Sequence, residues 1–180
     1  LHLLRKNEIK PSLAMWTFFS LAVGMSLLTF LKDGNFSYLD NILNTTDLIM
    51  VVSVALGIYF MGDKSARFNK FEKLLLAIVG VIIIFWIITQ NHFVSNILIQ
   101  AILVIAYIPV VSRMSKAREN TEPFSVWFLL LLAPIISLIS MKGDLAAYYT
   151  WRAIFCTSAL LILMFRIELK KKKIRQKIRG

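Results

Sequence analysis

Long apolar runs are the feature that most constrains what this chain can fold into. Six runs with few or no charges cover residues 12–31, 41–62, 71–89, 93–112, 124–141 and 145–165. About 20 residues of α-helix cross the hydrocarbon core of a bilayer, and backbone groups there must be hydrogen-bonded within the segment. The sequence therefore predicts an all-α integral membrane protein with six transmembrane helices.

The second run is the least regular of the six, because only residues 48–62 of it are uncharged. That stretch is too short to span a bilayer comfortably, so its helix is expected to begin near Asn41 and to carry Asp47 into the membrane. Hydrophobic residues make up 58% of the chain, against about 45–50% in a typical soluble domain. The single cysteine, Cys156, excludes an internal disulfide.

Lysines and arginines lie almost entirely on one side of this six-helix path. Of the 21 basic residues, only Lys32 and Lys142 fall in loops on the other side, and Arg152 falls within a run. Because basic residues accumulate on the cytoplasmic side, the C-terminus is predicted to be cytoplasmic, and we expect a bacterial inner membrane. The net charge of +11 is then a topology signal, and the lipid bilayer rather than nucleic acid is the expected partner.

An internal repeat with an offset of 111 residues relates the first apolar run to the fifth. The matched pairs include Trp16 with Trp127, Ser26 with Ser137, Asp33 with Asp144 and Tyr38 with Tyr149. The two copies lie four helices apart, which is an even number, so both copies run in the same direction. Parallel repeats of this kind occur in small secondary transporters.

The repeat predicts a division of the chain into four parts. These are a first unit at 1–62, a linker helix at 63–92, a second unit at 93–167 and a basic cytoplasmic tail at 168–180. The second unit has three expected helices and the first has two, so we expect one more helix before Leu1 in the natural protein. The tail is interpreted as a topology anchor, with binding to anionic lipid headgroups as the alternative.

The second unit carries a recognisable pattern of residues. The segment Tyr107-Ile108-Pro109-Val110 is followed by a basic loop and then by Thr121-Glu-Pro-Phe-Ser-Val-Trp127. This pattern resembles the SWEET/PQ-loop superfamily, which includes SWEETs, SemiSWEETs, PnuC-type vitamin transporters and the KDEL receptor. The resemblance implies two parallel three-helix bundles joined by a linker helix, with a central cavity between the bundles.

Two departures from that family concern its characteristic residues. The family's Pro-Gln pair is Pro109-Val110 here, so only the proline is kept, and it is a candidate hinge because it removes a backbone hydrogen bond. Where the family's pockets use a tryptophan, this chain offers Ser26 and Ser137, and the position of the family's pocket asparagine carries Arg152. These departures argue against a sugar as the ligand.

Asp47 and Arg152 are the sharpest functional candidates. A charged side chain in the hydrocarbon costs about 2.5–3.5 kcal/mol and needs a partner or a wet cavity. We therefore expect the two side chains to face each other across a central cavity, as an ion pair or external gate, or Arg152 to bind an anionic group of the ligand. The alternative is that both reach the external surface as charges at helix ends.

Several uncharged residues are further candidates. Asn96 and Gln100 share one helix face, and they are expected to bond either another helix or a ligand. Ser26, Ser137 and Tyr149 are also candidates for the pocket. Trp16 and Trp127 fit the interfacial aromatic belt, where indoles favour the headgroup level, and an internal gate or stacking surface is their functional alternative.

The remaining residues indicate no catalytic site. No Cys, His and Asp cluster has metal-ligand spacing, and no intramembrane serine has a histidine to activate it. We therefore expect no enzyme activity, no metal and no cofactor. The leading hypothesis is a transporter that carries a small polar or anionic solute by alternating access. Other copies of the same chain, in a homo-oligomer, are a candidate partner. The alternative is a membrane binding protein, such as a sorting receptor or a subunit of a complex.

Overall fold

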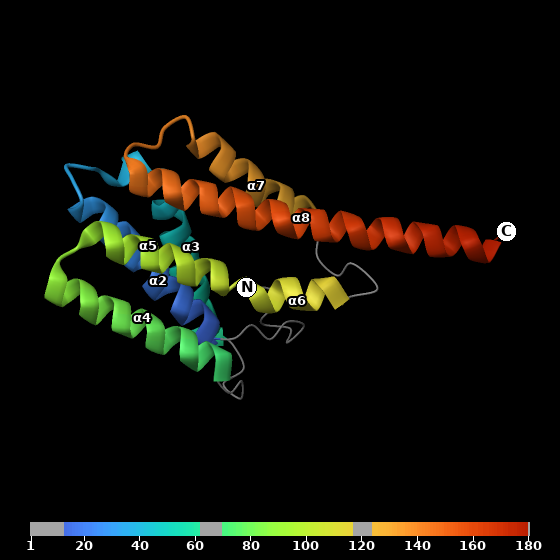
Figure 1. The fold of residues 1–180 in the computed structure, drawn as a ribbon, viewed down its shortest axis with the longest axis horizontal. Helices are drawn as coiled ribbons and strands as arrows, with labels where there is room; N and C mark the ends of the chain where they lie inside the picture. Colours follow the sequence, from blue (N-terminus) through green and yellow to red (C-terminus); the bar gives the residue numbers. More distant parts are fainter. Residues whose placement is uncertain (1–12, 62–69, 117–123, 180) are drawn as a thin grey trace.

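The structure is a computed structural model that describes residues 13–61, 70–116 and 124–179, and every regular element within these ranges is helical (Figure 1). The elements are α2 (Leu13–Lys32), the 3₁₀ helix η1 (Tyr38–Asn41), α3 (Ile42–Met61), α4 (Lys70–Thr89), α5 (His92–Ile105), α6 (Ile108–Lys116), α7 (Phe124–Ser137) and α8 (Asp144–Arg179). The predicted all-α class is confirmed for the described residues.

Within the ranges that the structure describes, four helical spans are long and apolar enough to cross a membrane. They cover Leu13–Lys32, Tyr38–Phe60, Lys70–Thr89 and His92–Ser112. The span at Tyr38–Phe60 includes Asp47, as the sequence predicted. These helices are compatible with an integral membrane protein, whereas six crossings are not established.

The fifth and sixth predicted crossings differ from expectation. The helix predicted at 124–141 is shorter, because α7 has 14 residues and ends at Ser137, before the turn at 138–140. The helix predicted at 145–165 is longer, since α8 continues without a break through the basic tail to Arg179. Lysine and arginine are good helix formers, so the change in composition at residue 168 does not end the helix.

The predicted helix at 93–112 is interrupted near its middle. α5 ends at Ile105 and α6 begins at Ile108, with Tyr107 N–H donating to the Val104 carbonyl at 3.0 Å across the break. Pro109 lies in the first turn of α6 and has no N–H to donate to the carbonyl four residues earlier. The proline therefore explains the break without ending the apolar span.

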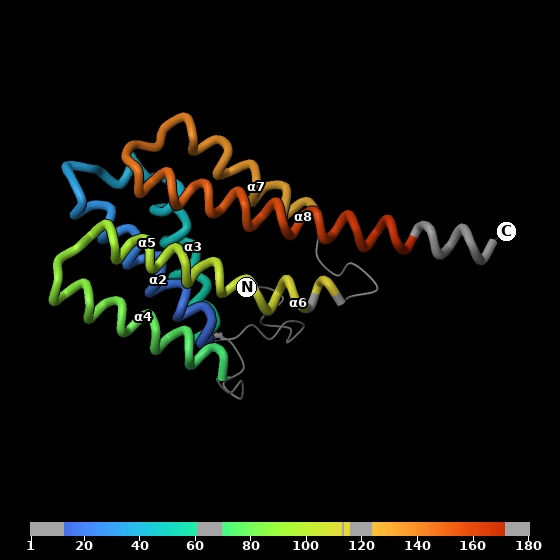
Figure 2. Tube along the Cα trace, viewed as in Figure 1, coloured from blue at the N-terminus to red at the C-terminus, as the bar shows by residue number. Residues whose placement is uncertain are grey.

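The helices form one bundle with α2 near its centre. In Figure 2, α2, α3, α4 and α5 lie together, while α7 runs along α8 on the other side. Phe18 and Ala22 of α2 pack against Leu75 and Val79 of α4 and against Ile99 of α5 in the main core. A second core joins α6, α7 and α8, and a third joins the end of α2 to the start of α8.

The packing does not divide cleanly into two three-helix units. α5, which the repeat assigns to the second unit, packs against α2 and α4 as well as against α8. The boundaries predicted at residues 62, 92 and 167 therefore remain predictions. The segments 1–12, 62–69 and 117–123 lie outside the described residues.

Two loops meet at one end of the bundle, which we call the loop end. Lys142 Nζ lies 2.7 Å from Asp40 Oδ1, and the Lys142 backbone N–H donates to the Asp40 carbonyl at 2.9 Å. Phe36 stacks on Phe30 with ring centroids 4.8 Å apart, and it fills the space beside Gly143. These contacts form a clasp between the α2–α3 connection and the α7–α8 connection.

Candidate functional site

A central cavity of about 340 Å³ lies between α2, α3, α5, α7 and α8. Among the described residues that line it, Asp47 of α3 and Arg152 of α8 are the only ones with a charged side chain. The rest of the lining is mostly apolar or aromatic, and includes Met15, Trp16, Phe19, Met50, Tyr107, Trp127, Leu130 and Tyr149. The cavity therefore combines two opposite charges with apolar walls.

Helical spacing brings the charged residues into the cavity. On α3, Leu43 and Asp47 are four residues apart and share one face of the helix. On α8, Tyr149, Arg152 and Ala153 are three and four residues apart and also face the cavity. The periodicity of each helix therefore places its charged residue on the face that lines the cavity.

Tyr149 joins the two charges. Its hydroxyl donates to Asp47 Oδ2 at 2.8 Å, and the Arg152 guanidinium carbon lies 4.5 Å from the centre of its ring. The tyrosine itself is only 1% exposed, whereas Asp47 and Arg152 are partly buried. An ion pair, which was one of the arrangements expected for Asp47 and Arg152, is not present between these two described residues. Instead, one phenol ring separates them, contacting the acid through its hydroxyl and the base through its face.

Arg152 is also held from the side of α5. Its Nε donates to Gln100 Oε1 at 2.8 Å. Gln100 Nε2 in turn donates to Ser26 Oγ at 2.8 Å and to Asn96 Oδ1 at 3.1 Å. Because the amide nitrogen of Gln100 makes these two hydrogen bonds, the amide oxygen is oriented toward Arg152.

A buried polar wall continues from Gln100 toward the loop end. Asn96 Nδ2 donates at 2.8 Å to both the Ser26 carbonyl and Thr29 Oγ1. The Asn44 amide lies 3.0 Å from Ser26 Oγ, and its oxygen can accept from that hydroxyl when it faces Ser26. Because Ser26 already accepts from Gln100, this orientation satisfies the hydroxyl both as acceptor and as donor. We call Ser26, Thr29, Asn44, Asn96 and Gln100 the polar wall.

The predicted site residues thus fall into two groups. Asp47, Arg152, Tyr149, Trp16 and Trp127 line the central cavity. The candidates that do not line it are Ser26, Asn96, Gln100, Ser137 and Pro109.

The candidates outside the cavity have partners within the protein. Ser26, Asn96 and Gln100 belong to the polar wall, which supports Arg152 from behind. Ser137 Oγ donates to the Pro134 carbonyl at 2.8 Å, so this serine bonds its own helix. Pro109 lies at the α5–α6 break, one residue before the cavity-lining Val110.

The sequence analysis missed two members of the polar wall. Asn44 is three residues before Asp47 on α3, and Thr29 is three residues after Ser26 on α2. Helical spacing to residues already singled out was the signal that pointed to both. Their partners on α2 and α5 lie far away in the chain, so spacing alone does not identify the contacts.

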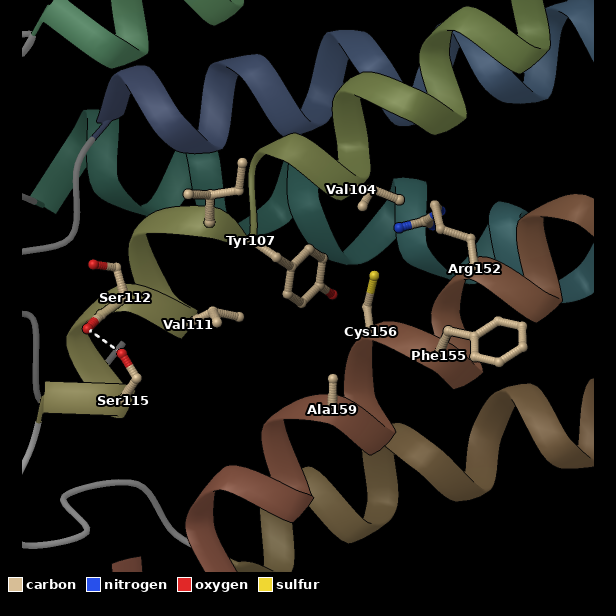
Figure 3. Close-up of a pocket in the computed structure, with 10 residues that line it drawn as sticks. Val104, Tyr107, Val111, Ser112, Ser115, Arg152, Phe155, Cys156 and Ala159 are labelled. Atoms are coloured by element: carbon tan, nitrogen blue, oxygen red, sulfur yellow. Dashed lines mark hydrogen bonds between the residues drawn. The ribbon is translucent and has the colours of Figure 1, made fainter. Parts of the chain in front are cut away.

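A second, more open pocket of about 650 Å³ lies between α8 and the α5–α6 segment (Figure 3). It shares Tyr107 and Arg152 with the central cavity. Figure 3 shows the Tyr107 ring and the Cys156 thiol between α6 and α8, with Phe155 at one side. Arg152 is therefore the boundary between the central cavity and a lateral, mostly apolar pocket.

No group of three or more His, Cys, Asp or Glu side chains that could hold a metal ion occurs in the described ranges. Comparisons with protein-family models, with curated proteins and with solved structures found no match for this chain.

Proposed function

We propose that this protein is a small-solute membrane transporter that works by alternating access through the central cavity. The observation that carries the proposal is a cavity with one acid and one base, enclosed by helices from both ends of the chain. Each charge costs about 2.5–3.5 kcal/mol to place in hydrocarbon. Charges at this depth are rare, and they typically mark a substrate pathway or line a water-filled cavity. A cavity that binds and releases a polar solute would account for both of them.

The internal repeat supports this proposal. Trp16 of α2 and Trp127 of α7 are 111 positions apart in the repeat and line the same cavity from different helices. We propose a SWEET-like arrangement in which α7 and the apolar part of α8 also cross the membrane. At about 1.5 Å per residue, α7 is roughly 21 Å long, so the turn after it would complete the crossing.

The loop end is the proposed outer gate. The distribution of basic residues along the predicted six-helix path favours an outer location for this end, since Lys32 and Lys142 fall in its loops while most other basic residues belong to the loops and tail predicted on the cytoplasmic side. The clasp between Asp40 and Lys142 and the stacked Phe36 hold the α2–α3 and α7–α8 connections together here. Transport then requires this clasp to open when the other end of the cavity closes.

Cysteine labelling tests the proposal without knowledge of the substrate. In a Cys156→Ala background, Leu43→Cys reports the end of the cavity near the loops and Met15→Cys reports the opposite end. Each variant is treated in oriented vesicles with a membrane-impermeant maleimide. Lys142→Gln, which removes the ion pair of the clasp, is expected to raise labelling of Leu43→Cys from outside and to lower labelling of Met15→Cys from the cytoplasmic side. Phe60→Cys, on the exposed face of α3, is the control and should not respond.

The reciprocal change is the signature of alternating access. If neither cavity position is labelled from either side, or if both rise together, the transporter proposal is wrong. Protected positions together with a co-purifying membrane partner would favour the alternative of a binding subunit.

A further inference from the structure

The two charges in the central cavity each keep unused bonding capacity. Asp47 has one hydrogen bond, from Tyr149 to Oδ2, which leaves Oδ1 without a partner among the described residues. Arg152 donates through Nε to Gln100, and its two terminal NH₂ groups make no hydrogen bond within the described part of the chain. Both groups line the cavity. An acceptor and a set of donors of opposite charge are therefore available to a ligand.

The balance of charge restricts the class of ligand. An anion that pairs with Arg152 is repelled by Asp47, and a cation that pairs with Asp47 is repelled by Arg152. A solute with both an anionic and a cationic group satisfies both side chains at once. Only the phenol ring of Tyr149 separates the two charged side chains. An α-amino acid carries its carboxylate and its ammonium group on one carbon, so a single molecule can contact Arg152 with the first and Asp47 with the second.

The walls restrict the rest of the ligand. Trp16, Phe19, Met50, Trp127 and Leu130 offer mainly apolar surface, with the two indole N–H groups as donors and the Met50 sulfur as a weak acceptor. If a ligand with several hydroxyl groups bound here, most of these hydroxyls would be buried without hydrogen-bond partners, which would weaken binding substantially. The remainder of the solute is therefore apolar and of a size that aromatic side chains can pack against.

We propose that the central cavity binds a zwitterionic solute with an apolar body, such as an apolar α-amino acid, whose carboxylate pairs with Arg152 and whose ammonium pairs with Asp47. This assignment rests on the proposed function only in taking the cavity as the transport site. Binding itself is measured on the purified protein without any transport step.

Equilibrium binding to the full chain in detergent tests the class of ligand. The probes are L-leucine, L-methionine and L-phenylalanine, each compared with its N-acetyl derivative, which lacks the cation, and with its amide, which lacks the anion. At least one amino acid is expected to bind, and both of its derivatives to bind about tenfold or more weakly, because each loses a charge-assisted hydrogen bond. Equal binding of either derivative would overturn the proposal, and so would binding of none of the three amino acids.

Two variants assign the charges to their groups. Asp47→Asn should remove the preference for the amino acid over its N-acetyl derivative, and Arg152→Gln should remove the preference over its amide. Asp33→Asn and Lys32→Gln change exposed residues outside the cavity and should leave both preferences unchanged. If the cavity variants prove too unstable to purify, the derivative series on the unmodified protein still decides the question.

The outcomes separate this inference from the transporter proposal. Reciprocal labelling of Leu43→Cys and Met15→Cys without amino-acid binding would leave a transporter of another solute class. Zwitterion binding without reciprocal labelling would leave a binding protein with the ligand site described here.

Discussion

The hydroxyl of Tyr149 offers the most direct test of the site's geometry. Tyr149→Phe removes the hydrogen bond to Asp47 at 2.8 Å and keeps the ring, which is 1% exposed and lies beneath Arg152. A hydrogen bond to a charged group contributes about 1.5–3 kcal/mol. For a chain of this size, that loss lowers the melting temperature by roughly 3–12 °C. The packing and the cation–π contact are unchanged, so the hydroxyl alone is measured.

Tyr148 provides a matched control for this experiment. It is the neighbouring residue on α8, is 48% exposed, and its ring contacts Phe93. Tyr148→Phe removes the same atom from an exposed position, so the change in unfolding free energy is expected to stay within about 0.5 kcal/mol. Both variants are compared by thermal unfolding of the purified protein in one detergent.

A double-mutant cycle shows whether Asp47 is the partner. Tyr149→Phe is expected to cost about 1–3 kcal/mol less in an Asp47→Ala background than in the unmodified protein. The reasoning is refuted if Tyr149→Phe and Tyr148→Phe have equal melting temperatures, or if the cycle shows no coupling between Tyr149 and Asp47.

Three further substitutions test other parts of the structure, each by thermal unfolding. Gln100→Leu leaves Arg152 Nε without its acceptor and is expected to cost about 2–3 kcal/mol; an unchanged stability would show that this hydrogen bond is not formed. Gly143→Ala is expected to cost about 1–3 kcal/mol, because Gly143 has φ +81° and an added Cβ would lie 2.7 Å from the Phe36 ring. Gly80 lies inside α4, and nothing lies within 4 Å of a Cβ added there, so Gly80→Ala is expected to stabilise the protein by about 0.5–1 kcal/mol. Equal effects of the two glycine substitutions would contradict the claim that the positive φ of Gly143 makes the difference.

Much of the local structure follows from patterns that are visible in the chain. The first four predicted spans correspond to helices within one or two residues at their starts, because the length of an apolar run and the need to pair every backbone group act locally. Asn96 and Gln100 share one face of α5, as their spacing predicted, and the structure adds a hydrogen bond between their side chains. The break before Pro109 has a local cause as well, although the sequence analysis treated the span as continuous.

Other features depend on the helices being packed together. Tyr149 and Asp47 are 102 positions apart, and Arg152 and Gln100 are 52 apart, so no local rule joins them. From the sequence, Asp47 and Arg152 were expected to face each other across one cavity, as an ion pair or external gate, or with Arg152 free to bind an anionic group of the ligand. The sequence analysis did not predict that Tyr149 would lie between them.

The sequence alone determined the helical class, the apolar spans, the asymmetry of basic residues and the two charges that such spans rarely contain. Only the tertiary structure decided that Tyr149 separates Asp47 from Arg152, that Gln100 holds the arginine from behind, and that the polar wall stands outside the cavity. The physical reason is that helix periodicity specifies which side chains share a face. The rotation of each helix and its choice of neighbours come from side-chain packing and from pairing buried polar groups between helices.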